Sequence, residues 1–132
     1  MRYLGIDYGS KRVGVAVSDE SLIFALPVSV IANTTDLVAE VGKIAAEYGT
    51  KDIVIGESRQ YDMSANKILP EILAFKDALD AAGFRTYLEL EFMTSLEAER
   101  EQGKHAKSDA SAAALILQRF LDRLRNERHE QP

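Results

Sequence analysis

Four carboxylates occupy positions where the pattern of the chain predicts that a strand ends or a helix begins: Asp7, Glu57, Glu91 and Asp109. Asp7 interrupts an apolar run in which a buried strand would favour valine, and Glu57 and Glu91 each follow a later apolar run. Carboxylates that converge repel one another unless a positive charge lies between them, and divalent cations with oxygen ligands are the usual solution. If the fold brings these residues together, they predict a metal site built from oxygen atoms.

Each carboxylate also has a purely structural explanation. Asp7 could simply begin the turn that follows it, and Glu57 and Glu91 could be solvated residues at the start of loops. Asp109 lies in the predicted first turn of a helix, where the helix dipole favours an acid whatever its role. However, Asp109 is in line with alanines on the stripe expected to face the sheet, and such small side chains would let the helix come close. The pattern is compatible with both interpretations.

The hydrophobic pattern predicts the elements that must position these residues. Five strands are expected, at 3–8, 13–18, 23–32, 52–56 and 84–90. Helices are expected after the capping residues 34–36, from a start between Ala65 and Pro70 to Gly83, at 95–100, and after Ser108. Pro27 favours an edge position or a bulge for the third strand. Three successive strands followed by alternating helices and strands predict an α/β fold, with a mixed five-stranded sheet flanked by helices.

This topology gathers the candidate residues at one edge of the sheet. If the strands 3–8, 52–56 and 84–90 are parallel, their carboxyl ends meet, and ligand sites of open α/β sheets form outside such ends. Alternation along the last strand places Arg85, Tyr87, Glu89 and Glu91 on one face, and of the two acids we expect Glu89 to be exposed and Glu91 to turn inward. The sequence therefore predicts that the carboxylates after these three strands lie close together.

Composition limits the classes of protein to which the chain can belong. The 132 residues are 46% hydrophobic, as in a single globular domain, which we expect to span 1–126, with 127–132 as a polar tail. Zero cysteines exclude disulfides, thiolate zinc sites and cysteine nucleophiles. No apolar stretch approaches the roughly 20 residues of a membrane span and no signal peptide is evident, so we expect a cytoplasmic protein. The formal charge of -5 argues against non-specific adhesion to nucleic acid, but it does not exclude a local basic surface.

Three motifs carry a resemblance to a known family. The stretches "GIDYGSKRVGVAVSD", "TSLEA" after Glu91, and "SDASAAALILQRFL" resemble the YqgF family of pre-16S rRNA nucleases and Holliday-junction-resolvase-like proteins. The resemblance covers nearly the whole chain and implies the ribonuclease H-like fold. It also implies hydrolysis of phosphodiester bonds in nucleic acid with two Mg²⁺ or Mn²⁺ ions, and its acidic site residues fall on Asp7, Glu91 and Asp109. The implied substrate is the 5′ end of precursor 16S rRNA, with a branched DNA as the alternative.

Two segments depart from the family's usual pattern. The chain has Leu90-Glu91-Phe92 where the family commonly has Asp-Glu-Arg, so one acid and one phosphate-facing cation are missing. It has Gly56-Glu57-Ser58 where the family commonly has Gly-Leu-Pro. Glu57 thus stands at a strand end where other ribonuclease H-like nucleases place a catalytic acid, and we expect it to be a metal ligand or to support one.

Cations near these elements are candidates for binding substrate phosphates, although most surface cations are only solvated charges. The candidates are Lys11, Arg12, Arg59, Lys104 and Lys107.

Two further classes of function compete with the nuclease. "GIDYGS" also resembles the first phosphate loop of actin-type and sugar-kinase-type ATPases, but those proteins enclose ATP between two such domains and 132 residues supply only one. The changes at Leu90 and Phe92 are compatible with a non-catalytic RNA-binding module that has ribosomal or transcription partners. Nothing in the chain decides between a monomer and a homodimer.

Overall fold

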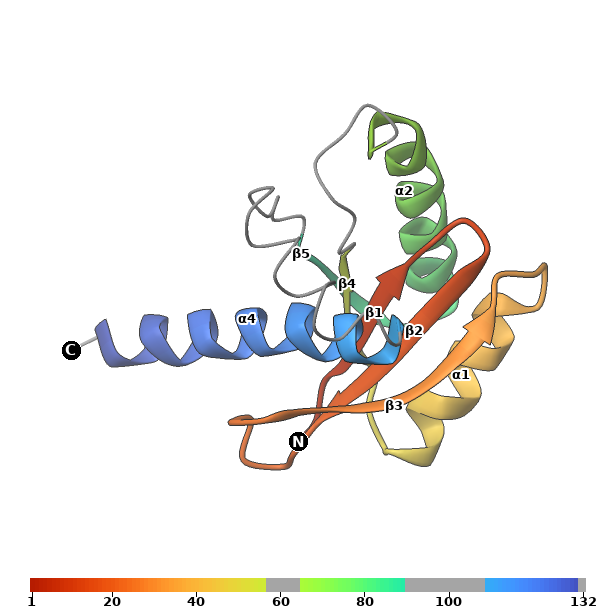
Figure 1. Ribbon diagram of the computed structural model, residues 1–132. Coiled ribbons are helices and arrows are strands. Elements are labelled where there is room, and N and C mark those ends of the chain that lie inside the picture. Colours follow the sequence, from red (N-terminus) through yellow and green to blue (C-terminus); the bar gives the residue numbers. More distant parts are fainter. Residues whose placement is uncertain (57–64, 90–108, 131–132) are drawn as a thin grey trace.

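The strands form one mixed sheet, as the hydrophobic pattern predicts. The computed structural model describes residues 1–56, 65–89 and 109–130 (Figure 1). The sheet has the order β3-β2-β1-β4-β5, and its strands are β1 (Leu4–Tyr8), β2 (Arg12–Ser18), β3 (Ala25–Ala32), β4 (Asp52–Gly56) and β5 (Arg85–Glu89). The pairs β1–β2 and β2–β3 are antiparallel, whereas β1–β4 and β4–β5 are parallel. The carboxyl ends of β1, β4 and β5 therefore meet at one edge, which confirms the predicted topology.

Helices cover both faces of the sheet. The helices α1 (Leu37–Glu47) and α2 (Ala65–Ala81) pack with Leu4, Ile6 and Ile55 in one apolar cluster. Helix α4 (Asp109–Glu130) packs with Tyr3 and Val54 in a second cluster on the opposite face. Figure 1 shows α4 crossing the strands and continuing beyond the sheet at its carboxyl end. Successive strand residues alternate between these two layers, so the face on which a residue lies decides which helices it can touch.

Helix α4 comes very close to the central strand at Gly5. A Cβ atom added to Gly5 would lie 2.7 Å from Leu117 Cβ and 3.1 Å from the Ala113 carbonyl oxygen. Contacts this short between atoms that are not bonded are strongly repulsive, so any residue larger than glycine would push the helix away. Glycine at this position therefore sets the distance between α4 and β1.

Several ends of elements differ from the predicted ones. Strand β3 begins at Ala25 rather than at Ile23, and the predicted bulge opposite Pro27 is present as a register shift between Val15 and Ala16. Helix α2 begins at Ala65, so Pro70 lies inside it, and the missing N–H of Pro70 removes one intrahelical hydrogen bond. The segment 95–100 lies outside the described residues.

Helix α4 runs on to Glu130, into the segment that we expected to be a polar tail. Among the described residues, no helix has both the length and the apolar character needed to cross a membrane.

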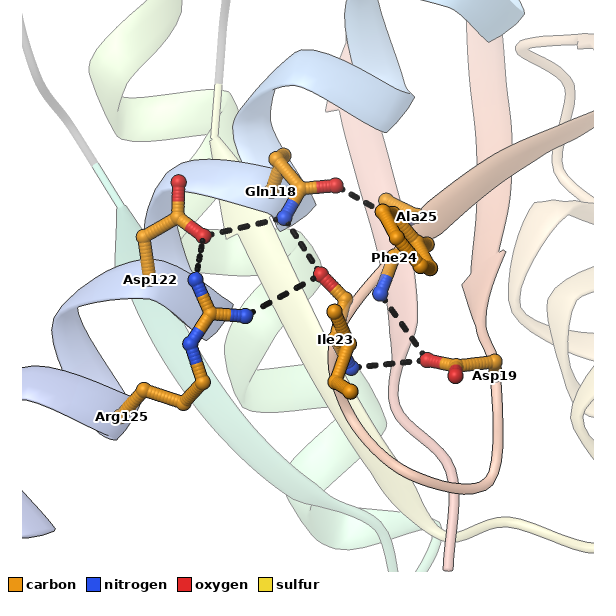
Figure 2. Close-up of polar contacts among 7 residues, drawn as sticks. All are labelled: Asp19, Ile23, Phe24, Ala25, Gln118, Asp122 and Arg125. Atoms are coloured by element: carbon orange, nitrogen blue, oxygen red, sulfur yellow. Dashed lines mark hydrogen bonds and ion pairs between the residues drawn. The ribbon is translucent and has the colours of Figure 1, made fainter.

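The loop between β2 and β3 explains the late start of β3 (Figure 2). Asp19 Oδ1 accepts hydrogen bonds from the backbone N–H groups of Ile23 and Phe24, at 2.8 and 2.9 Å. These bonds hold both residues in a turn, although their apolar side chains look like part of a strand. Leu22 has φ 61°, an uncommon value for a residue other than glycine, and its side chain is buried beneath α4.

Candidate active site

Asp7 is a buried carboxylate at the carboxyl end of the central strand. Its exposed fraction is 7%, and its direct neighbours in the sheet are Gly14 on β2 and Gly56 on β4. Residues that lie opposite one another share a face, so Asp7 is flanked on the α4 face by two positions without side chains. The carboxylate thus lies at the carboxyl edge of the parallel strands, in a place where ligand sites of α/β sheets form.

The hairpin turn next to Asp7 is held in place by a residue that the sequence analysis did not single out. Asn33 Nδ2 donates to the Gly9 carbonyl at 2.8 Å, and the Asn33 N–H donates to the Lys11 carbonyl at 3.0 Å. A Cβ atom at Gly9 would lie 2.5 Å from the Arg12 carbonyl oxygen, so the turn requires glycine there. The candidate cations Lys11 and Arg12 are both exposed on this fixed turn, at the same edge as Asp7. An asparagine directly after a strand was the available signal for this role.

The prediction for Glu89 was wrong. Its exposed fraction is 4%, and it lies in the same row as Asp7 and Gly56, on the face covered by α4. Arg123 on α4 donates from Nη1 to Glu89 Oε2 at 3.0 Å, and its Nη2 lies 2.5 Å from Oε1. Alternation correctly gives the face of Glu89, but only the path of α4 makes that face buried. Neither member of this ion pair was singled out as functional from the sequence.

A third buried carboxylate lies at the opposite end of the same face. Asp52, at the start of β4, accepts hydrogen bonds from Arg85 Nε at 2.7 Å, from Arg85 Nη2 at 3.0 Å and from the Tyr87 hydroxyl at 3.1 Å. The Arg85 hydrogen bonds hold the pKa of Asp52 below its ordinary value. Burial, together with the hydroxyl's bond to Asp52, raises the pKa of Tyr87. This network lies at the amino ends of the parallel strands, away from the edge at which Asp7 lies.

The described residues include only part of the predicted site. Asp109 is the first residue of α4. Five other candidates lie outside the described residues: Glu57, Arg59, Glu91, Lys104 and Lys107. Within the described ranges, no three acidic or imidazole side chains are grouped closely enough to hold a metal ion.

The described part of the site suits a hard divalent cation. The donor that it supplies is a carboxylate, and oxygen ligands are those that Mg²⁺ and Mn²⁺ prefer. The two neighbours of Asp7 in its row, Gly14 and Gly56, bring no side chain to its carboxylate. The backbone of β5 and helix α4 pack tightly over Gly56, where an added Cβ would lie 2.5 Å from the Glu89 carbonyl oxygen and 3.0 Å from Ile116 Cγ2.

Comparisons with known proteins agree with this architecture. The chain matches the model of the RuvX family, described as Holliday junction resolvase, over residues 1–123. A protein of Agathobacter rectalis named "Putative pre-16S rRNA nuclease" is 36% identical, with 97% of this chain and 99% of that protein covered. A protein of the same name from an Anaeromyxobacter species is 38% identical, with 92% and 97% covered.

Two solved structures share the fold at low sequence identity. The T. thermophilus RuvC structure in complex with a Holliday junction substrate has a TM-score of 0.57 at 16% identity, covering 92% of this chain and 94% of that one. The fowlpox virus Holliday junction resolvase has a TM-score of 0.52 at 12% identity, covering 94% and 99%.

The strand order, the helices on both faces and these structural neighbours define the class: a protein with the ribonuclease H-like fold. Within this class, the chain belongs to the RuvX family, which is the YqgF family that its motifs resemble.

Proposed function

We propose that this chain is a metal-dependent endonuclease that hydrolyses phosphodiester bonds, with the 5′ end of precursor 16S rRNA as its substrate. The observation that carries the proposal is Asp7, a buried carboxylate between two glycines at the carboxyl edge of parallel strands. Membership of the RuvX family supports it, as do the names of the curated relatives. The expected compartment is the cytoplasm, with ribosomal or transcription proteins as possible partners.

The proposed metal ligands are Asp7, Glu91 and Asp109, with Glu57 as a further ligand or as support for one. Two Mg²⁺ or Mn²⁺ ions, when bound with substrate, would supply activation of the attacking water and stabilisation of the leaving oxygen. Asp7 lies on the central strand and is therefore the ligand expected to be shared. Asp109 would approach from α4, because that helix begins at this residue and crosses the face on which Asp7 lies.

Cations at the same edge would hold the substrate backbone. Lys11 and Arg12 are exposed on the hairpin turn beside Asp7, and Arg59, Lys104 and Lys107 are the other proposed contacts. Contacts to phosphate position a nucleic acid without reading its sequence. We therefore expect these residues to contribute to affinity and to the placement of the scissile phosphate rather than to the choice of sequence.

A branched DNA is the second candidate substrate, because the family that matches is described as Holliday junction resolvase. The two substrates share the phosphodiester chemistry and differ in shape. A direct comparison of a structured precursor rRNA and a four-way DNA junction is therefore part of the test.

The decisive experiment compares wild type, Asp7→Asn and the control variant Asp52→Asn on both substrates, with Mg²⁺, Mn²⁺ or EDTA. We expect wild type to cleave the RNA only with metal, and Asp7→Asn to lose cleavage by about 10²-fold or more. Asp52→Asn is a matched control, because Asp52 is also a buried acid. It should retain cleavage, because Asp52 lies at the other end of the sheet. Thermal unfolding confirms that each variant is folded.

The other outcomes separate the alternatives. Preferred cutting of the DNA junction would favour the resolvase activity, and ATP hydrolysis without cleavage would favour the ATPase alternative. RNA binding without cleavage in any metal would favour a non-catalytic module. Cleavage by Asp7→Asn at the wild-type rate would contradict the proposed site.

A further inference from the structure

Helix α4 is held against the sheet at one point of closest approach. Leu117 and Ala113 lie over Gly5, where no side chain separates the helix from β1. Around this point α4 also packs on the sheet through an apolar cluster that includes Ile116, Phe120 and Leu121, but apolar packing is non-directional. The angle between α4 and the strands therefore depends on what holds the helix on either side of Gly5.

One anchor ties α4 to the loop before β3 (Figure 2). Gln118 Oε1 accepts from the Ala25 N–H at 2.9 Å, and Gln118 Nε2 donates to the Ile23 carbonyl at 2.7 Å. Asp122 Oδ1 accepts from Gln118 Nε2 at 3.0 Å and from Arg125 Nη2 at 2.8 Å, which orients the Gln118 amide. The Gln118 side chain, directly next to Leu117, thus accepts a hydrogen bond from one backbone N–H and donates one to a nearby backbone carbonyl of the same segment.

The other anchor ties α4 to the end of β5. Arg123 contacts both carboxylate oxygens of Glu89, and its guanidinium lies 5.7 Å from the centre of the Phe120 ring. Phe120 packs in turn on Tyr3 and Tyr87, at ring-centre distances of 5.2 and 5.3 Å. The charge-assisted hydrogen bond from Arg123 Nη1 to Glu89 Oε2 is the directional contact of this pair, whereas the buried Oε1 lies close to Nη2 but accepts no hydrogen bond. The two anchors thus hold α4 at β3 and at β5, on opposite sides of β1.

A rigid helix transmits a movement at one end to the other. At about 1.5 Å per residue, Asp109 lies about 12 Å from Leu117 along the axis, and Arg123 lies about 9 Å from it on the other side. A displacement of Arg123 across the sheet therefore moves Asp109 by a similar distance in the opposite direction. Misplacement of a catalytic group by about 1 Å can lower a rate by about 10²-fold.

We propose that Arg123 is a positioning residue of the active site: its ion pair with Glu89 sets the angle of α4 over the sheet and so places Asp109 relative to Asp7. This inference rests on the proposed function, in which both acids hold metal. Arg123 acts through the helix and does not touch the reacting atoms. The chain provides a matched control, because the pair Arg85–Asp52 has the same chemistry, a similarly buried acid and a partly exposed arginine at the amino ends of the strands.

The test compares Arg123→Met/Glu89→Leu with Arg85→Met/Asp52→Leu, since removing both partners leaves no buried charge unpaired. The chain has no cysteine, so spin labels on Leu115→Cys of α4 and Asp77→Cys of α2 report the position of α4 without background. We expect the Arg123 double variant to broaden the distance distribution and to lower kcat by about 10- to 100-fold with KM unchanged. It should also weaken Mn²⁺ binding, measured by the electron paramagnetic resonance of free Mn²⁺ in unlabelled protein.

The control double variant should lose a similar amount of thermal stability and keep the wild-type label distances, kcat and Mn²⁺ affinity. Arg123→Lys, which keeps the charge, should restore part of the rate. Unchanged label distances, kcat and Mn²⁺ affinity in the Arg123 double variant would overturn the inference, as would equal losses in the two double variants. If the wild-type protein neither cleaves nor binds Mn²⁺, the proposed function fails, and with it the catalytic consequence of the ion pair. The label distances would still decide whether Arg123 sets the angle of α4 over the sheet.

Discussion

Two acids on the α4 face of the sheet are buried as ion pairs whose arginines stay partly in water. Asp52 and Glu89 are each 4% exposed, whereas the side chains of Arg85 and Arg123 are 65% and 52% exposed. An arginine can cover apolar surface with its methylene groups and keep part of its guanidinium hydrated. This arrangement lowers the cost of bringing the carboxylate into the interior, because only one of the two charges loses most of its water.

The lowered pKa of Asp52 makes the Arg85 pair sensitive to acid. The pKa of Asp52 is lower in the folded state than its ordinary value of 3.8. The stabilisation that Arg85 gives is therefore fully present at pH values well above 3.8, and it is lost as the pH falls through the pKa of the folded state. We expect Arg85→Met to lower the free energy of unfolding at neutral pH, because the buried Asp52 carboxylate loses its cationic partner. The difference from wild type should shrink as the pH falls below 3.8, as measured by urea unfolding.

Asp52→Asn provides the control for this prediction. In that background Arg85 has no carboxylate to pair with, so Arg85→Met should have the same small effect at every pH. A difference between wild type and Arg85→Met that stays constant from neutral pH to pH 3 would contradict the assigned cause.

At the level of single residues, the sequence identifies the acid that interrupts a strand but not the partners of the other acids. Asp7 stands out because alternation and an apolar context make its position unusual. Glu89 has an equally clear face, yet its burial depends on α4 crossing that face, and no local pattern specifies the crossing. Arg123 looks like an ordinary polar residue of an amphipathic helix, since its partner lies 34 residues away in the chain.

At the level of elements, glycine has opposite effects in the central strand and in a helix. At Gly5 an added Cβ would lie 2.7 Å from Leu117 Cβ, whereas at Gly42 in α1 the nearest atom would be Phe84 Cζ at 3.6 Å, an ordinary contact. We expect Gly5→Ala to destabilise the protein by about 1–3 kcal/mol through overpacking. Gly42→Ala should stabilise it by about 0.5–1 kcal/mol, because glycine is unfavourable within a helix.

Urea unfolding measures both changes, and equal m-values would show that the unfolded states are comparable. If Gly5→Ala were neutral, the close approach of α4 to β1 would not be required for stability.

The Gln118 contacts offer a separate test of how α4 holds the loop before β3. Gln118→Met should retain the length of the side chain and lose both hydrogen bonds to the loop, at a cost of about 1–2 kcal/mol. We expect the Ala25 amide, which donates to Gln118, to exchange its hydrogen at least tenfold faster. The Tyr48 amide, which is bonded within α1 through Ile44, should keep its rate. Similar acceleration at both amides would indicate global destabilisation instead.

The element order could be predicted because apolar periodicity and the glycine and proline positions are local signals. The ends of the elements could not be predicted where side chains compete for backbone hydrogen bonds. Ile23 and Phe24 have the apolar character of a strand, but Asp19 takes both of their N–H groups and delays β3 to Ala25. The candidate site was predictable only as a set of strand ends, since convergence requires parallel pairing of β1, β4 and β5.

At the level of the whole molecule, the proposed function requires an acidic protein to bind a polyanion, which calls for a local basic surface. The net charge of -5 repels nucleic acid at a distance, so under the proposed function we expect the attraction to come from cations at the carboxyl edge of the sheet. Lys11 is exposed on the turn beside Asp7. Lys43 is also exposed, but it lies on α1, which covers the opposite face of the sheet. Substituting each lysine in turn separates the effect of its location on nucleic-acid binding from the effect of total charge.

The salt dependence of binding distinguishes these two effects. Each phosphate contact contributes about 0.7 to 0.9 to the slope of log affinity against log salt concentration. Lys11→Gln should therefore reduce the slope by about this amount and weaken binding similarly for different sequences, whereas Lys43→Gln should leave the slope unchanged. Fluorescence anisotropy with a structured RNA, in an Asp7→Asn background that prevents cleavage, measures both variants. Equal changes in slope for the two lysines would mean that net charge, and not a phosphate-binding edge next to Asp7, governs binding.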